Sequence, residues 1–432
     1  MTHGEFQLIY VVHYNSAGFR RQDKKGEEET GQMRRTWLKI LLAPLFILLA
    51  VGFLQAGETA DSKGEGLKYS AEFEGGKLYR AGLVSVLELT GNYRQMGRQY
   101  GILLKNELRD LYNVAVEAFF IKKQGIAREK LDTIAKAVFD PYPRRYKEII
   151  YGMAETSGLG LDKQVLLNAI EWFPKIGNLW YGRCSGIAVW GPYTSGGSLV
   201  FGRNNDDAPL YKDFARFMVV SVFKPHDGSL PAAIINYAGA IYNPTGMNSE
   251  GLFVEMNAGP WMGFSLDRIS IFTTLFSFLQ DYSSLPELDR AFKSTLTNIS
   301  AIVNVADRER AYAYESSLYD TRRVDPEQDG ILAATNHFVG PTWNIAQVDD
   351  RMGGWTMKRR SNLLSLGENY KGTFSPRVMM KVLDTTIDQG GSTHEGTIYQ
   401  VIAVPAQLKL WIKVPDLQDW TMIRLGPLFK KH

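Results

Sequence analysis

Hydrophobic residues recur every three or four positions through residues 92–124, the spacing of a helix with one buried face. Similar amphipathic stretches predict further helices over 127–138, 142–157 and 162–173. The residues before them, 57–75, are rich in Gly, Glu and Lys and are interpreted as a linker. The apolar positions of the first helix are Met96, Tyr100, Leu103, Leu104, Leu108, Leu111 and Val114.

The pattern changes at Cys184, where short apolar runs separated by turn residues replace the helical period. The expected strands are residues 185–190, 198–203, 217–224, 232–237 and 252–257. The later elements are expected to be a helix near 285–295, a hairpin of 301–306 with 311–314, a strand ending at Thr335, helices near 355–366 and 375–384, and a hairpin of 397–404 with 407–414. Because strands and helices come in blocks, antiparallel sheets covered by helices are favoured over a βαβ order.

The N-terminal residues carry the features of an export signal. Residues 1–32 are polar, and after Met33 three basic residues precede residues 40–54, which contain no charge. This apolar core is shorter than the roughly 20 residues that span a bilayer, and residues 54–56 (Leu-Gln-Ala) resemble a cleavage site. We therefore expect residues 1–56 to be a leader with a signal peptide and the protein to be periplasmic or extracellular. Met33 and Met1 are the two alternatives for the start of translation. An uncleaved N-terminal membrane anchor is the alternative.

Composition narrows the chemistry. With 45% hydrophobic and 22% charged residues and a net charge of +3, the chain is expected to be globular and not to bind nucleic acid. Its one cysteine excludes an internal disulfide and a thiolate zinc cluster, and the six histidines have no metal-ligand spacing. We expect no metal and no cofactor. The motifs of P-loop nucleotide binding, zinc proteases and serine hydrolases are missing from the sequence.

The lone cysteine is the candidate nucleophile, although a free cysteine is more often an inert buried residue. Residues 191–197 predict a turn that folds the strand ending at Arg203 back beside the strand that follows Cys184. Arg203 and Asp206 would then lie close to the thiol. A guanidinium in that place would lower the pKa of the thiol and favour the nucleophilic thiolate.

Five sequence blocks in order support this interpretation and resemble one known family. They are Cys184 with Gly202-Arg203-Asn204-Asn205-Asp206, Asn248 to Leu252 with Asn257, Thr335-Asn336-His337, Thr356 with Arg359 and Leu363, and Gly396-Thr397-Ile398. Together they resemble the cysteine-type N-terminal-nucleophile (Ntn) hydrolases. The match is to the branch similar to acyl-CoA:6-aminopenicillanic acid acyltransferase, whose relatives are choloylglycine hydrolase and penicillin V acylase.

The resemblance implies an α+β fold, a four-layer αββα sandwich of antiparallel sheets preceded by a mostly helical N-terminal segment. It also implies that the chain cuts itself between Arg183 and Cys184. The cut would yield an α fragment, residues 57–183, and a β fragment, residues 184–432, which remain associated.

In the family, the new N-terminal residue supplies both nucleophile and base. By resemblance, the thiol of Cys184 attacks the substrate, and its α-amine, which titrates near about 8, accepts the proton. Asp206 would hold that amine. Arg203 would stabilise the thiolate.

The remaining roles also come from the resemblance. Asn257 would form the oxyanion hole, Asn336 would bind the amine or the substrate amide, and Arg359 would organise the site electrostatically. A turn cap is the alternative role for Asn336, and Arg360 is an alternative to Arg359. His337 is expected to support the structure.

These features together predict an exported, self-cleaving amidohydrolase or acyltransferase that forms a Cys184 thioester. The expected partner is a small acyl amide or thioester substrate, and a homo-oligomer is an option. The alternatives are a phospholipase B-like hydrolase of lipid esters or amides, and a non-catalytic binding protein with the same fold. A papain-like protease using His337 is disfavoured, because its cysteine would open a helix rather than a strand.

Overall fold

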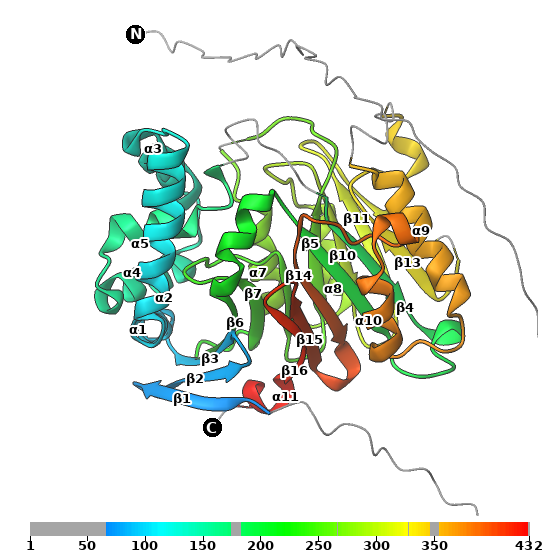
Figure 1. Cartoon of the computed structure of the whole chain (residues 1–432), viewed down its shortest axis with the longest axis horizontal. Helices are drawn as coiled ribbons and strands as arrows, with labels where there is room; N and C mark the ends of the chain where they lie inside the picture. Colours follow the sequence, from blue (N-terminus) through cyan, green and yellow to red (C-terminus); the bar gives the residue numbers. More distant parts are fainter. Residues whose placement is uncertain (1–65, 174–182, 266, 327, 346–353, 431–432) are drawn as a thin grey trace, which may run out of the picture. The chain divides into compact units, whose positions relative to one another are not determined.

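The computed structural model of the chain describes residues 66–173, 183–265, 267–326, 328–345 and 354–430 (Figure 1). The described residues fall in the second of the two units into which the chain divides, Thr59–His432. The predicted leader, with its export signal, lies outside the described residues. Arg183 and Cys184, between which the chain is predicted to cut itself, belong to the second unit. Within the described ranges, no helix is both long and apolar enough to cross a membrane.

Two sheets form the framework of the second unit. The larger has ten strands in the order β1 (Lys68–Phe73), β2 (Gly76–Ala81), β3 (Val84–Gly91), β6 (Met218–Pro225), β7 (Ala232–Tyr237), β8 (Thr245–Asn248), β9 (Phe253–Ala258), β10 (Ala301–Ala306), β11 (Ala311–Ser316) and β12 (Thr321–Val324). The smaller has six, in the order β13 (Ile331–Ala334), β4 (Ser185–Val189), β5 (Val200–Asp206), β14 (Thr397–Val404), β15 (Lys409–Val414) and β16 (Gln418–Arg424). The paired strands are antiparallel, apart from β3 and β6, which run parallel.

Helices cover the outer face of each sheet. Helices α7 (Ile271–Asp281) and α8 (Leu285–Lys293) pack on the larger sheet, and α9 (Thr356–Asn369) and α10 (Pro376–Asp384) pack on the smaller one (Figure 1). The inner faces meet where β4 contacts β9 and β11 contacts β13. At Gly186 on β4 an added Cβ would lie 2.5 Å from Glu255 Oε1 on β9, so this close approach requires glycine. The predicted α+β, αββα arrangement is confirmed.

Most helices in the chain before Cys184 form where the hydrophobic period predicts them. They are α1 (Tyr93–Leu103), α2 (Lys105–Leu111), the π-helical Tyr112–Lys123, α3 (Arg128–Phe139), α4 (Arg144–Ser157) and α5 (Leu161–Asn168). The first begins at a capping box of Asn92 and Gln95, which satisfies two backbone N–H groups of its first turn. Further along the chain, α9 and α10 confirm the two helices expected near 355–366 and 375–384.

The interpretation of residues 57–75 as a linker is wrong from Lys68 onward, because β1 begins there. Strand β1 lies at the edge of its sheet and is largely exposed, so it has no apolar run to reveal it. The chain before Cys184 thus contributes three strands as well as helices. Through the pairing of β3 with β6, it shares a sheet with the chain after Cys184.

Other elements were not predicted: β2, β3, α7, β8, β12, β16 and the final helix α11 (Leu425–Phe429). Helix α7 is rich in aromatic and β-branched residues and is buried on nearly all sides, so it lacks the amphipathic period. Short 3₁₀ turns complete the fold at Gly191–Tyr193, Pro209–Phe217, Pro341–Trp343, Ile387–Gln389 and Pro405–Gln407.

Candidate active site

The β4–β5 hairpin places the candidate nucleophile beside its predicted neighbours. Cys184 directly precedes β4, which pairs antiparallel with β5 so that Gly186 lies opposite Arg203. Asp206 ends β5 and pairs with Thr397 of β14 on the other side. The predicted hairpin is therefore confirmed.

The thiol of Cys184 is buried and lies against the end of β5. The backbone N–H of Asp206 donates to Sγ at 3.4 Å, and the thiol donates to the carbonyl oxygen of the same residue at 3.3 Å. Arg203 Nη2 lies 3.9 Å from Sγ. Burial raises the pKa of the thiol to about 11, although the charge of Arg203 lowers it. Arg203 acts in the expected direction, but in the uncleaved chain desolvation outweighs it and the thiol stays protonated near pH 7.

Arg203 is held by a buried carboxylate that the sequence reasoning missed. Its Nη1 lies 3.3 Å from Glu255 Oε2, and both side chains are almost fully buried. Nη2 donates to Asn205 Oδ1 at 2.7 Å and to the carbonyl oxygen of Met256 at 2.9 Å. Burial raises the pKa of Glu255, while Arg203 lowers it. Removing one member of such a pair costs about 3–5 kcal/mol, because the other charge stays buried alone.

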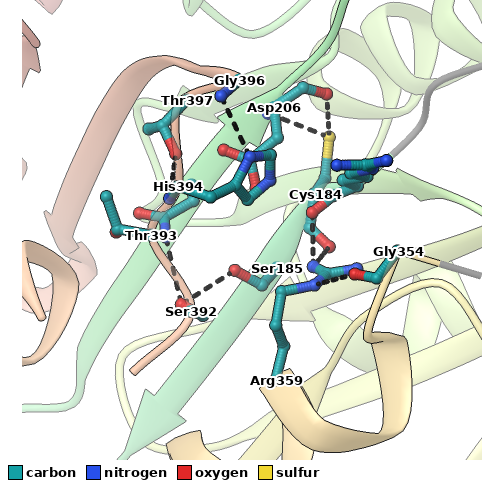
Figure 2. A network of polar contacts seen from close by, with 12 residues as sticks. Cys184, Ser185, Asp206, Gly354, Arg359, Ser392, Thr393, His394, Gly396 and Thr397 are labelled. Carbon is teal, nitrogen blue, oxygen red and sulfur yellow. Dashed lines mark hydrogen bonds and ion pairs between the residues drawn. The ribbon is translucent and has the colours of Figure 1, made fainter. Parts of the chain in front are cut away.

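Asp206 faces a histidine that was not predicted (Figure 2). Its carboxylate is fully buried, and Oδ2 lies 3.3 Å from Nε2 of His394. Within the described part of the chain, neither carboxylate oxygen has a hydrogen-bond partner. A buried carboxylate without a hydrogen-bond donor is costly, so Asp206 has the capacity to accept a hydrogen bond from a further group.

Arg359 reaches the peptide bond predicted to be cut. The guanidinium donates from Nη1 to the carbonyl oxygen of Arg183 and, at 3.0 Å, to that of Cys184 (Figure 2). Its Nε donates to the carbonyl oxygen of Gly354 at 3.0 Å. The neighbouring Arg360 instead donates from Nε to the carbonyl oxygen of Ala333 at 2.9 Å. It is therefore Arg359, and not Arg360, that contacts the candidate site.

Asn336 contacts Arg359 directly. Its Oδ1 accepts a hydrogen bond from Arg359 Nη2 at 2.8 Å, and its Nδ2 donates to the carbonyl oxygen of Ala258 at 2.8 Å. Arg203 donates to the carbonyl oxygen of Met256, and Asn336 donates to that of Ala258. Both side chains therefore bond the backbone of β9, on either side of Asn257.

Asn257 itself is fully buried and weakly engaged. Its Nδ2 makes two long contacts of 3.4 Å, to Glu255 Oε1 and to the carbonyl oxygen of Ala334, and its Oδ1 has no hydrogen-bond partner within the described ranges. Such long bonds leave the amide N–H groups available to a stronger acceptor.

As expected, His337 has structural contacts: its Nδ1 lies 2.9 Å from the hydroxyl oxygen of Thr356.

The described residues contain no cluster of three or more His, Cys, Asp or Glu side chains suited to a metal ion. A cavity of about 210 Å³ lies between β11, β13 and α9, where Glu315, Leu332, Arg360 and Leu364 are among its lining residues. Cys184 is not among them.

Two residues of the site, Glu255 and His394, were not predicted from the sequence, and they differ in whether the sequence carries a signal for them. Glu255 interrupts the apolar strand Phe253–Ala258 two positions before Asn257, so the strand period places both on one face. An acidic residue in a buried strand is a signal that could have been used. His394 lies in a polar turn before β14, and no periodic signal distinguishes it.

Two sheets packed between helical layers, with a cysteine directly before an inner strand, define the class of cysteine-type Ntn hydrolases and acyltransferases. Within it, the chain belongs to the acyl-coenzyme A:6-aminopenicillanic acid acyl-transferase family, whose model matches residues 193–418. The match confirms the resemblance drawn from the sequence blocks. It starts after Cys184, so it supports amide hydrolysis or acyl transfer as the class of activity without identifying the nucleophile.

Solved structures were also compared. An N-acylethanolamine-hydrolysing acid amidase orthologue from Caenorhabditis elegans is 17% identical, with a TM-score of 0.41, and the alignment covers 54% of this chain and 95% of that one. A mutant conjugated bile acid hydrolase from Clostridium perfringens is 14% identical, with coverages of 58% and 95% and a TM-score of 0.40. For penicillin V acylase from Agrobacterium tumefaciens the identity is 12%, the coverages are 56% and 86%, and the TM-score is 0.38. No curated protein matches the chain.

Proposed function

We propose that the protein is an exported enzyme that cuts its own chain between Arg183 and Cys184. The matured enzyme then hydrolyses linear amides, or transfers their acyl group, through a Cys184 thioester. The observation that carries the proposal is the contact of Arg359 with the carbonyl oxygen of Arg183, because that oxygen becomes negatively charged when the adjacent thiol attacks.

The cleavage is an N-to-S acyl shift followed by hydrolysis. Sγ of Cys184 forms a bond to the carbonyl carbon of Arg183, and the thiol proton passes to the amide nitrogen as the C–N bond breaks. A thioester and a free α-amine result. Water then attacks the thioester, which releases the carboxylate of Arg183 and restores the thiol of Cys184.

The freed amine fits the site around Asp206. An α-amine has a pKa near about 8, so it is an ammonium ion for part of the time and a neutral base for the rest. The buried carboxylate of Asp206, which has no hydrogen bond in the uncleaved chain, is a suitable acceptor for this group. The same residue also fixes Sγ through its backbone, so Asp206 can orient both reacting groups of Cys184.

In turnover, the neutral amine would take the proton of the thiol, and the thiolate would attack the acyl carbon of the substrate. The negative oxygen that develops needs donors, and the weakly engaged Nδ2 of Asn257 can supply one. The protonated amine then gives its proton to the leaving amine. The acyl thioester passes to water or to an acceptor, so hydrolysis and acyl transfer share every earlier step.

Cleavage would leave the two fragments associated. Strand β3 of the α fragment pairs with β6 of the β fragment over Ser85–Gly91 and Val219–Pro225, and these hydrogen bonds do not depend on the peptide bond at 183–184. Separation of the fragments would therefore require unfolding.

Mass analysis of the purified protein tests the proposal. At 48.6 kDa for 432 residues, residues 57–183 weigh about 14 kDa and residues 184–432 about 28 kDa. The larger piece should begin with Cys184. The Cys184→Ala variant should stay uncut and inactive, whereas the matched control Ser185→Ala should still cleave. An active enzyme in which Arg183 remains joined to Cys184 would refute the mechanism.

Export is a separate part of the proposal, supported by the charge and hydropathy of residues 33–56. Cell fractionation should find the mature protein outside the cytoplasm, with an α fragment that begins near Gly57. A cytoplasmic protein that retains residues 33–56 would contradict it.

A further inference from the structure

His394 lies on a short segment that is fixed to the strand carrying Asp206. Asn204 on β5 donates from Nδ2 to the hydroxyl of Ser392 at 3.0 Å and to that of Thr393 at 2.8 Å. The backbone of Asp207 continues this attachment, since its N–H donates to the carbonyl oxygen of Gly396 at 3.0 Å. The ring is therefore held in place by contacts on both sides of it (Figure 2).

The turn that follows determines which ring nitrogen carries the proton. The backbone N–H of Gly396 donates to Nδ1 of His394 at 3.0 Å, so Nδ1 must offer its lone pair. In the neutral ring the proton is then on Nε2, the nitrogen that lies 3.3 Å from Asp206 Oδ2. Residue 396 must be glycine for the ring to fit, because an added Cβ would lie 2.8 Å from Cε1 of His394.

Among the lysine, arginine and histidine side chains of the described ranges, His394 is the one that lies within ion-pair distance of Asp206. Arg203, on the same strand, pairs with Glu255 instead. Oδ2 therefore lies near a ring nitrogen that carries a proton, but within the described ranges neither carboxylate oxygen nor Nε2 has a hydrogen-bond partner in the uncleaved chain.

We propose that His394 is a positioning residue for Asp206. Its Nε2–H holds Oδ2 and so directs Oδ1 toward the α-amine of Cys184 once that amine has been released. The inference rests on the proposed function, since it assigns the histidine a part in turnover by an N-terminal Cys184. Self-cleavage itself needs the thiol and the carbonyl of Arg183, but no free amine, so it does not depend on this contact.

Three substitutions separate the two ring nitrogens. His394→Phe keeps an aromatic ring at this position and removes both nitrogens. His394→Gln can place an amide N–H where Nε2 lies, and His394→Asn can place a carbonyl oxygen where Nδ1 lies. The exposed His226, which contacts Thr90 on a different part of the fold, provides the control His226→Phe. The measurements are the rate of self-cleavage after cell-free synthesis, and kcat and KM for a fluorogenic N-acyl amide that the mature wild-type enzyme hydrolyses.

We expect His394→Phe to cleave itself within about threefold of the wild-type rate, yet to lose about tenfold or more in kcat with little change in KM, as for a group that orients a reacting residue. His394→Gln should recover most of the loss and His394→Asn should not. The inference is overturned if His394→Phe keeps its kcat, if it fails to cleave, if His394→Asn recovers as much as His394→Gln, or if neither recovers. A wild-type chain that never exposes Cys184 would refute the proposed function instead.

Discussion

Removing the guanidinium of Arg359 should slow self-cleavage more than it harms the fold. In the uncleaved chain, this group donates to the carbonyl oxygens of Arg183, Cys184 and Gly354 and to Oδ1 of Asn336. The first of these acceptors changes during the reaction, from a neutral carbonyl oxygen to an oxyanion. The other three keep the same charge in the ground state and in the transition state.

The size of the effect follows from that difference. Loss of one donor to an oxyanion typically costs about 10²–10³ in rate, or about 2.7–4 kcal/mol. The bonds to the other acceptors are lost equally from ground and transition states, so they affect stability and not the barrier. Each acceptor left buried without a donor costs about 1–3 kcal/mol of folding free energy. Arg359→Ala should therefore have a lower Tm than the wild type, and its folded fraction should cleave about 10²–10³-fold more slowly.

The assay is a time course of self-cleavage after cell-free synthesis, followed on a denaturing gel by the appearance of the roughly 28-kDa fragment. Thermal unfolding of the same variant shows whether it has folded. Arg360→Ala is the matched control, because this neighbouring arginine donates to Ala333 and not to the scissile peptide. Added guanidinium ion should restore part of the rate of Arg359→Ala. A folded variant that cleaves within about threefold of the wild type would refute this role for Arg359.

Two further predictions follow from the site. Because burial raises the pKa of the Cys184 thiol to about 11 in the uncleaved chain, the thiolate fraction rises about tenfold per pH unit below that value. Cleavage timed in buffers from about pH 6 to pH 9 should accelerate in proportion, and a flat profile would mean that thiolate formation does not limit the step. Asn257→Ala should lower kcat for an N-acyl amide by about 10²–10³ with little change in KM, because an oxyanion donor acts mainly in the transition state. A rise in KM at unchanged kcat would assign Asn257 to substrate binding instead.

The sequence could predict the part of the site that is local in the chain. Cys184, Arg203 and Asp206 lie on one hairpin, and the turn residues between its strands are visible in the sequence. Strand period and turn chemistry are short-range properties, so this geometry needs no knowledge of the rest of the fold. The helices of the α fragment were predictable for the same reason.

Asn336 and Arg359, which are far from Cys184 in the sequence, were predicted from the family resemblance alone. Arg359 lies on α9 and Asn336 follows β13, and no local rule indicates that Arg359 meets both the carbonyl of Arg183 and the side chain of Asn336. His394 was missed because its role depends on which strand lies beside β14. Tertiary pairing determines these contacts, and it has no periodic signal in the sequence.

Strands at sheet edges were missed for a related reason. β1 is largely exposed, so its sequence lacks the alternation of a half-buried strand. Helix α7 was missed for the opposite reason. It is buried on nearly all sides, so it has no polar face that would mark it as a helix in the sequence. Both cases show that an amphipathic pattern arises only where one face of an element is buried and the other meets water.

If the chain is cut as proposed, the parallel pairing of β3 with β6 has a consequence for the reversibility of folding. Before the cut, β3 and β6 belong to one covalent chain, so their association is unimolecular and independent of protein concentration. After the cut, the same hydrogen bonds join two separate polypeptides, and refolding becomes a bimolecular reaction. Dilute mature enzyme that has once been denatured should therefore fail to regain its structure, whereas the uncut Cys184→Ala chain should recover it at any dilution.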